Sequence, residues 1–358
     1  MILTKLDRFI MKKFLGTFVF MLFLLMSISI VFDLSEKLNE FIENGAPWDE
    51  IIFVYYANFF IYFGTQFSYL LNFISVIWFT SKMAGNTEIV PILSSGISYK
   101  RFLRPYFFSA TILVVATILT YNFVLPNSNR TRIAFEEQYY RDYDNKLNVR
   151  LQMSPSEILY FYHYSGENRI ITDFALEKME DNHLIYSLKA RRATGDSLSN
   201  DWHFEEVALR RIGEFNDDMF YADKLDTTLN FSIADIVFRS SIIEAMDNEE
   251  LDDFIKEQEK TGSEKIPVYL IEKHKRWASP FAIFILTLIG VSVSSKKSRG
   301  GVGVNIAIGL GICVLYIFSM QMTTVAAIKV GFTPVLAVWL PNIIFSFVAY
   351  FLYLKAPK

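Results

Sequence analysis

Glu88 is the carboxylate that opens a short segment, GNTEIVPILSSGIS (residues 85–98), between two long stretches without a single charged residue. Asn86 or Thr87 can cap a helix at this point, because their side-chain oxygens accept hydrogen bonds from the first free N–H groups. A carboxylate at Glu88 is then favoured by the positive end of the helix dipole. The pattern therefore predicts a short helix over about residues 86–97.

The rest of this segment gives the expected helix an apolar face. Ile89, Ile92 and Leu93 have the i, i+3, i+4 spacing of residues that share one side of a helix. Pro91 is tolerated near the first turn, and Gly96 suits the left-handed residue that ends many helices. Two interpretations stay open: the helix rests on a bilayer surface, or it docks into a groove on a cytoplasmic partner.

Patterns of catalytic and metal-binding residues are missing from the sequence. The four histidines are widely spaced without an HExxH or similar pair, and the single cysteine, Cys313, lies deep in an apolar run. No GxxxxGK[ST] motif occurs, since the glycines at 300, 301 and 303 lack the lysine. We therefore expect no catalytic residue, metal or cofactor, with ATP hydrolysis left to a partner subunit. The net charge of -3 argues against nucleic acid binding.

Long apolar runs on both sides position the segment at residues 85–98. Hydrophobic residues make up 52% of the 358 residues, and the mean hydropathy is +0.26, above the usual range of soluble proteins. A membrane-spanning helix needs about 20 apolar residues, and each central Asp, Lys or Arg costs about 2.5–3.5 kcal/mol. The charge-free runs are Phe14–Phe32, Ile51–Ser81, Pro105–Asn129, Trp277–Ser295, Gly300–Ile328 and Val330–Leu354. They predict a polytopic α-helical membrane protein with six transmembrane helices.

The basic residues near the ends of these runs predict the orientation of the chain. Lysine and arginine concentrate on the cytoplasmic side of membrane proteins. One set of ends carries Lys5, Arg8, Lys12, Lys13, Lys82, Lys100, Arg101, Arg104, Lys296, Lys297, Arg299, Lys355 and Lys358, while the opposite short loops carry Lys37 and Lys329. Both termini and the segment at residues 85–98 are therefore expected in the cytoplasm, and the long insert between the third and fourth runs outside.

The insert, residues 130–270, divides the chain into residues 1–129, the insert itself and residues 271–358. Its alternating, β-branched and aromatic stretches at 158–164, 183–195, 202–213 and 228–238 are separated by turn formers. Short strands at this spacing predict an extracytoplasmic all-β domain, a sandwich or jelly roll, followed by a helical connector. Its charges are best explained by a solvated sheet surface; the alternatives are that its inner face holds a lipid chain or that an open edge pairs with another sheet.

Several motifs, in order along nearly the whole chain, resemble the LptF/LptG permease family. Residues 6–18 (LDRFIMKKFLGTF) resemble the opening of the family, and residues 87–105 (TEIVPILSSGISYKRFLRP) resemble its cytoplasmic segment. Residues 125–129 (LPNSN), 275–303 (KRWASPFAIFILTLIGVSVSSKKSRGGVG) and 331–342 (GFTPVLAVWLPN) resemble later parts of the family pattern. The start LDRFI and the aspartate directly after the first run favour LptG over LptF.

The resemblance implies a permease subunit of the ABC transporter that extracts lipopolysaccharide from the bacterial inner membrane. It implies that the helix at residues 86–97 docks on a dimeric LptB-like ATPase, with coupling residues Glu88, Ile89, Ile92, Leu93 and Gly96. It further implies a second LptF/LptG-type permease, an LptC-like partner for a jelly-roll domain, and transfer of lipopolysaccharide towards a periplasmic bridge.

Such a substrate has acyl chains and phosphates, so its cavity needs apolar walls with a cationic outer rim. Aromatic residues of the first two runs can supply the walls: Phe18, Phe23, Phe32, Phe59, Phe60 and Phe67. Lys37, Arg130 and Arg132 are candidate phosphate contacts. Ordinary packing for the aromatics, and snorkelling to headgroups for the cations, are the alternatives.

Gly303, Ala307 and Gly311 are each four residues apart and place small side chains on one helical face. Such a face lets another helix approach closely. The resemblance implies a lateral gate against the first helix of the partner permease, and packing within one subunit is the alternative.

Two other functions stay open at this stage: a permease for another lipid or a lipoprotein, and a membrane receptor with a periplasmic β sensing domain. The receptor predicts a cytoplasmic output domain, yet the longest internal segment expected inside the cell is residues 82–104.

Overall fold

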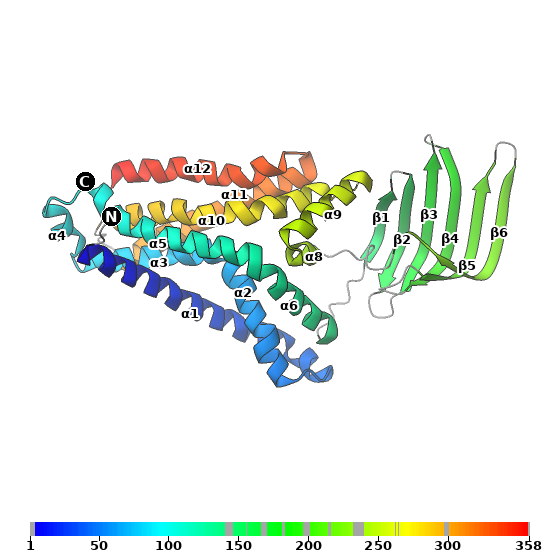
Figure 1. Cartoon of the computed structure of the whole chain (residues 1–358), viewed down its shortest axis with the longest axis horizontal. Coiled ribbons are helices and arrows are strands. Elements are labelled where there is room, and N and C mark those ends of the chain that lie inside the picture. The colour runs from blue at the N-terminus through cyan, green and yellow to red at the C-terminus, as the bar shows by residue number, and fades with distance from the viewer. Residues whose placement is uncertain are drawn as a thin grey trace. The chain divides into compact units, whose positions relative to one another are not determined.

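The computed structural model describes residues 4–139, 146–154, 156–165, 170–180, 183–195, 201–213, 216–231, 240–261, 263, 265–296 and 301–356. The chain divides into two compact units. One holds residues 1–140, 244–248 and 267–358, and the other holds residues 141–243 and 249–266. The first unit contains the long helices and the second contains the sheet (Figure 1). The elements of each unit are given below.

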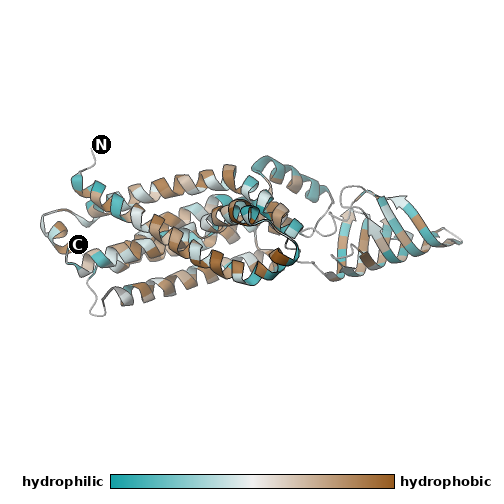
Figure 2. Cartoon of the chain, turned by 90° about the horizontal axis from the view of Figure 1, so that it is seen from below, coloured by the Kyte–Doolittle hydropathy of each residue, from teal (hydrophilic) through white to brown (hydrophobic). Residues whose placement is uncertain are grey.

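Among the described residues, the helical unit contains five helices that are long and apolar enough to cross a membrane, or six spans if a bent pair is counted as one. The helices are α1 (Lys5–Glu43), α5 (Tyr99–Leu119), α6 (Leu125–Tyr139), α10 (Ile266–Ser294), α11 (Gly301–Val330) and α12 (Pro334–Lys355), with α5 and α6 forming one span. Apolar residues follow the long helices throughout (Figure 2). The prediction of a polytopic helical membrane protein with a β domain is confirmed.

The second span is broken. A π-helical turn, η1 (Glu50–Tyr56), leads into α2 (Ala57–Gln66), and α3 (Ser68–Gly85) follows at an angle of 69°. The break falls at Phe67, whose φ of −97° and ψ of 8° leave the helical region. The charge-free run Ile51–Ser81 predicted one span but not the bend, although Gly64 lies three residues before it.

The third span continues beyond the predicted end at Asn129. A π-helical turn, η2 (Thr120–Val124), joins α5 to α6, and the helix then reaches Tyr139. Pro126 lies two residues after this turn, close to where the regular ladder of hydrogen bonds is already interrupted. The helix therefore passes the proline that suggested an exit from the span.

The core of the helical unit is formed where α3 and α10 pack against their neighbours. In the most apolar part of α10, 67% of the residues are buried, compared with 17% in α1. Asn72 of α3 donates to the carbonyl of Ile283 and to the hydroxyl of Thr287 at 3.3 and 3.0 Å. Gly290 lets α10 approach α3, since a Cβ there would lie 2.9 Å from Val76. The central helices are thus fixed by packing, whereas α1 lies at the margin.

The second unit is an antiparallel sheet in which each strand pairs with the next along the chain. Its strands are β1 (Lys146–Ser154), β2 (Glu157–Ser165), β3 (Ile170–Glu180), β4 (His183–Gly195), β5 (Asp201–Ile212) and β6 (Asp217–Thr228). One face is apolar, and its core includes Phe161, Phe174, Trp202 and Phe204. The indole N–H of Trp202 donates to the carbonyl of Phe231 at 2.9 Å.

This up-and-down order is simpler than the predicted jelly roll, in which strands distant in sequence pair with each other. Among the described residues the strands form a single sheet with short connections. Most of the strand predicted at 228–238 lies outside the described residues. The predicted helical connector corresponds to α8 (Ser240–Ala245) and α9 (Asn248–Thr261).

Candidate functional site

The turn between α3 and α4 (Ile89–Ser94) gives the short helix its direction. The N–H of Glu88 donates to the carbonyl of Met83 at 2.9 Å, and the N–H of Thr87 donates to that of Ala84 at 3.1 Å. This pair of bonds is a Schellman ending, whose left-handed position is usually glycine. Here Thr87 occupies it with a φ of +61°, a conformation that costs a β-branched residue about 1–2 kcal/mol. The chain therefore holds this turn against local strain.

Glu88 lies directly before α4, but neither predicted cap acts on the helix. The Nδ2 group of Asn86 donates to Oε1 of Glu88 at 2.9 Å, and the hydroxyl of Thr87 donates to the carbonyl of Asn86. The helix begins at Ile89 without a side-chain cap among the described residues. It is thus shorter than predicted, because the residues expected to start it form the end of α3.

The apolar face of α4 turns into the protein. Ile89 is 2% exposed and belongs to the core cluster that also contains Phe102 and Tyr106 of α5. Ile92 and Leu93 pack against the same cluster. Val90, which the sequence analysis did not single out, is 62% exposed. The predicted face therefore anchors α4, while its outward side presents Val90.

The end of α4 agrees with its predicted stop. The N–H of Gly96 donates to the carbonyl of Leu93 at 3.2 Å, and Gly96 has a φ of +86°. Ser98 then caps α5, because its side chain accepts from the N–H of Arg101 at 3.3 Å. Two capped turns thus enclose α4 between α3 and α5.

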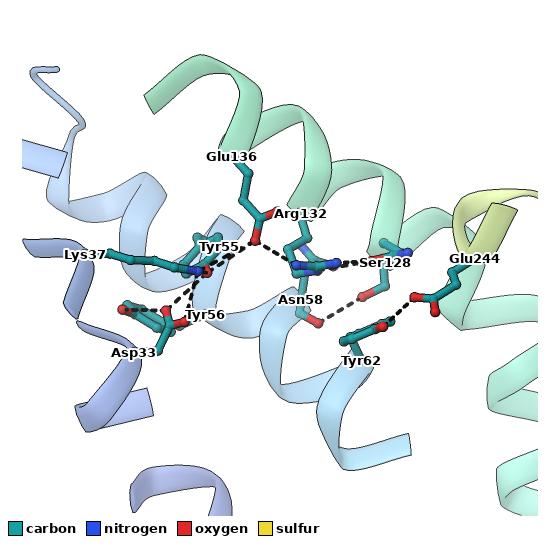
Figure 3. A network of polar contacts seen from close by, with 11 residues as sticks. Asp33, Lys37, Tyr55, Tyr56, Asn58, Tyr62, Ser128, Arg132, Glu136 and Glu244 are labelled. Carbon is teal, nitrogen blue, oxygen red and sulfur yellow. Dashed lines mark hydrogen bonds and ion pairs between the residues drawn. The ribbon is translucent and has the colours of Figure 1, made fainter. Parts of the chain in front are cut away.

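A polar network joins α1 to η1 of the second span and to α6 of the third (Figure 3). Lys37 lies 2.9 Å from the carboxylate of Asp33 and donates to the hydroxyl of Tyr55 at 2.6 Å. That hydroxyl donates to Asp33 at 3.1 Å, and Tyr56 donates to the same carboxylate at 3.3 Å. Glu136 of α6 lies 3.9 Å from Lys37. The charge of Lys37 is therefore balanced inside the chain.

Arg132 extends this network along α6. Its Nη1 group lies 2.6 Å from Glu136, and its Nε and Nη2 groups donate to the side-chain oxygen of Asn129 at 3.0 and 2.7 Å. The guanidinium group is 4.5 Å from the ring centroid of Tyr62, whose hydroxyl donates to Glu244. Of the predicted phosphate contacts, Lys37 and Arg132 thus meet at Glu136.

Arg130 has a different environment. Its Nε group donates to the carbonyl of Ala245 at 3.0 Å. Nearby in sequence, the carbonyl of Met246 accepts from Arg276 at 2.8 Å, and Asn248 accepts from the same guanidinium at 3.1 Å. Two arginines thus hold the short segment at residues 244–248.

The predicted aromatic walls fall into two groups. Phe59 is 5% exposed and Phe18 packs against the main core cluster. Phe23 and Phe67 are 58% and 43% exposed, and the rings of Phe23 and Phe60 lie 5.2 Å apart. Phe32 is also exposed. The exposed group follows α1 and α2, on surface that the chain itself leaves open.

The model of the family described as lipopolysaccharide export system permease LptF/LptG matches residues 8–355. The chain belongs to the LptF/LptG family. Members of this family are permease subunits of a transporter for lipopolysaccharide export. A comparison with curated proteins found no match. The preference for LptG over LptF stays a prediction.

The small-residue stripe predicted for this LptF/LptG chain lies on the outside of α11. Gly303, Ala307 and Gly311 are exposed, and a Cβ at either glycine would meet no heavy atom of the described chain within 4 Å. Gly309 faces the other way, where a Cβ would lie 2.1 Å from Ile77 of α3. Packing within the subunit therefore uses Gly309 and leaves the predicted stripe open.

Residues that the sequence analysis missed connect the predicted ones. Asp33 and Glu136 neutralise Lys37 and Arg132, and each forms an i, i+4 pair that the sequence shows. No local sequence pattern predicts that these two ion pairs, one on α1 and one on α6, lie next to each other. Among the described residues, no group of three or more His, Cys, Asp or Glu residues could hold a metal ion.

Proposed function

We propose that this chain is a transmembrane permease subunit that extracts lipopolysaccharide from the inner membrane and passes it to a periplasmic bridge. A separate, LptB-like ATPase dimer supplies the energy. The observation that carries this proposal is the family match over residues 8–355, which includes both the helical unit and the sheet.

In this proposal both termini and α4 face the cytoplasm, and the sheet unit faces the periplasm. The distribution of lysine and arginine supports this orientation. The N-terminal end of α1, the ends of α3 and α5 next to α4, and the C-terminal end of α12 carry basic residues. ATP is a cytoplasmic substrate, so the docking surface has to lie on that side.

α4 is the coupling element. Ile89, Ile92 and Leu93 hold it against the core, and Gly96 sets its end, so that a push on its outward side moves a packed part of the protein. Glu88 and the exposed Val90 are then the residues closest to the ATPase. A short helix whose flanking turns are hydrogen-bonded to the ends of α3 and α5 suits this role.

The lipid chains contact the open aromatic surface of α1 and α2, including Phe23 and Phe67. Phe18 supports this wall from within. Lys37, Arg130 and Arg132 are the proposed phosphate contacts, and each would exchange a present partner for phosphate. Since Asp33 and Glu136 compete for the first and third of these cations, binding would open the network as it occurs.

A second LptF/LptG-type permease covers the stripe of Gly303, Ala307 and Gly311, forming the lateral gate, and an LptC-like protein contacts the sheet. The open stripe supports the first pairing, because small residues allow close helix contact in lipid.

The test is reconstitution. The chain is expressed with the ATPase and second permease of its own organism, placed in liposomes with lipopolysaccharide, and supplied with a soluble periplasmic acceptor. We expect ATP-dependent transfer of lipopolysaccharide to the acceptor. Transfer of a lipoprotein or another lipid, with none of lipopolysaccharide, would contradict the proposed substrate, and ATP hydrolysis by the isolated chain would contradict the proposed division of work.

A further inference from the structure

The N-terminal end of α1 is fastened to α5 by an ion pair between Asp7 and Arg101. The two Nη groups of Arg101 each donate to one carboxylate oxygen of Asp7, both at 2.6 Å. Thr4 completes the cluster, since its N–H and hydroxyl donate to Asp7 at 2.9 and 2.8 Å. Asp7 is only 3% exposed. Such a forked contact fixes orientation as well as distance.

Arg101 is placed by the turn that follows α4. Only residues 95–98 separate α4 from α5, and Arg101 lies in the first turn of α5. The N–H of Arg101 donates both to the carbonyl of Ser98, at 2.9 Å, and to its side chain. A displacement of α4 therefore reaches Arg101 through a short, hydrogen-bonded connection.

Apolar packing joins the same three elements. Ile10 and Phe14 of α1 are fully buried, in one cluster with Ile89 of α4 and Phe102 of α5. Protein interiors are close-packed and have low compressibility, so such a cluster moves as a unit. The ion pair thus adds a polar contact between α1 and α5 to an apolar cluster that already includes the inner side of α4.

The middle of α1 is largely exposed, and its buried residues among those described are Met21 and Met26. Only 17% of the residues in its most apolar part are buried, and Phe20 and Val31 are 61% and 63% exposed. Its far end is tied again, by Asp33 and Lys37 to the second and third spans. A helix that is fixed at its two ends and open between them can tilt when one end is moved.

We propose that the Asp7–Arg101 ion pair transmits the movement of α4 to α1, which makes α1 the helix that the ATPase displaces. This inference rests on the proposed function. It assigns Asp7 and Arg101 as positioning residues. Neither needs to touch ATP or lipid, and both determine how much lipopolysaccharide is transported per ATP hydrolysed.

The test uses the complete complex in liposomes and measures the amount of lipopolysaccharide released per ATP hydrolysed. Arg101→Gln should lower this ratio by about fivefold or more, the lower end of coupling between sites in proteins. ATPase co-purification should stay unchanged. The exchanged pair, Asp7→Arg with Arg101→Asp, should restore most of the ratio. Arg104→Gln, at an exposed position one turn further along α5, is the matched control and should leave the ratio unchanged.

A ratio for Arg101→Gln within about twofold of the unmodified complex, or an equal fall for Arg104→Gln, would overturn the inference. If the variants fail to assemble, hydrogen exchange in the unmodified complex decides instead. Adding nucleotide should alter exchange in residues 4–13 together with residues 86–104, and a change confined to residues 86–104 would refute transmission to α1. Hydrolysis without any lipid release in the unmodified complex would refute the proposed function itself, and the exchange measurement would still decide on the ion pair.

Discussion

Replacing Val90 by aspartate changes the outward side of α4 without touching its inner side. Val90 is 62% exposed, and complete burial of a valine side chain contributes about 1.5–3 kcal/mol. Covering the exposed part of the Val90 side chain with a docked ATPase would therefore contribute about 1–2 kcal/mol to binding. A buried carboxylate adds a further desolvation cost. Since about 1.4 kcal/mol is a factor of ten, we expect Val90→Asp to weaken ATPase binding at least tenfold.

The assay is a titration of purified ATPase against the permease in nanodiscs, with the thermal midpoint of the permease measured in parallel. Val90→Asp should lower affinity and leave the midpoint unchanged. Ile89→Ala, on the adjacent but buried residue, is the matched control: it should lose about 2–5 kcal/mol of unfolding free energy, because it empties a core position. Wild-type affinity for a folded Val90→Asp protein would refute α4 as the docking surface.

Three further outcomes follow from the structure. Thr87→Gly should stabilise the isolated permease by about 0.5–1 kcal/mol, seen as a higher thermal midpoint, because glycine adopts the left-handed conformation without strain. Glu136→Gln should destabilise it by about 2 kcal/mol or more, because Arg132 loses its carboxylate partner in a largely buried position; an unchanged midpoint would contradict the importance of the network. Gly303→Leu should reduce permease pairing in cross-linking experiments at unchanged stability, whereas Gly309→Leu should destabilise the subunit by its clash with α3.

The transmembrane helices could be predicted from sequence because one quantity decides them, the free-energy cost of placing a charged side chain in the bilayer. Six runs without charge cannot remain in water at low cost, and each contains the apolar part of a long helix or of the bent pair, although the run Val330–Leu354 begins at the last residue of α11 and crosses the turn before α12. The bend at Phe67 was not predicted, because the apolar run continues through it and an isolated glycine such as Gly64 is tolerated within a helical pattern. The length of the third span was underestimated because Pro126 was interpreted without the π-helical turn before it.

The α4 segment shows the same limit at the level of single residues. Periodicity gave the correct set of residues on one face, Ile89, Ile92 and Leu93, but periodicity does not say what covers that face. In the structure, this face is covered by the core of the helical unit. The consequence for function is that Val90 becomes a large apolar residue exposed on the outward side of the helix.

The strands were recovered where alternation was strong, as in β2, β4 and β5. β1, β3 and β6 were missed. In β6 most side chains are exposed, and its sequence, DDMFYADKLDTT, is too polar to mark it as a strand. Its pairing with β5 supplies the information that local sequence lacks.

The central claim is that a separate ATPase acts on this permease at α4. A photo-activated cross-linking amino acid placed at position 90 in living cells tests it most directly, with Phe53 as the control position, because Phe53 is 75% exposed and lies in the π-helical turn before α2. We predict cross-links to the ATPase from position 90 and none from position 53. Cross-links from position 53, or their absence from position 90 while the ATPase co-purifies, would contradict the claim.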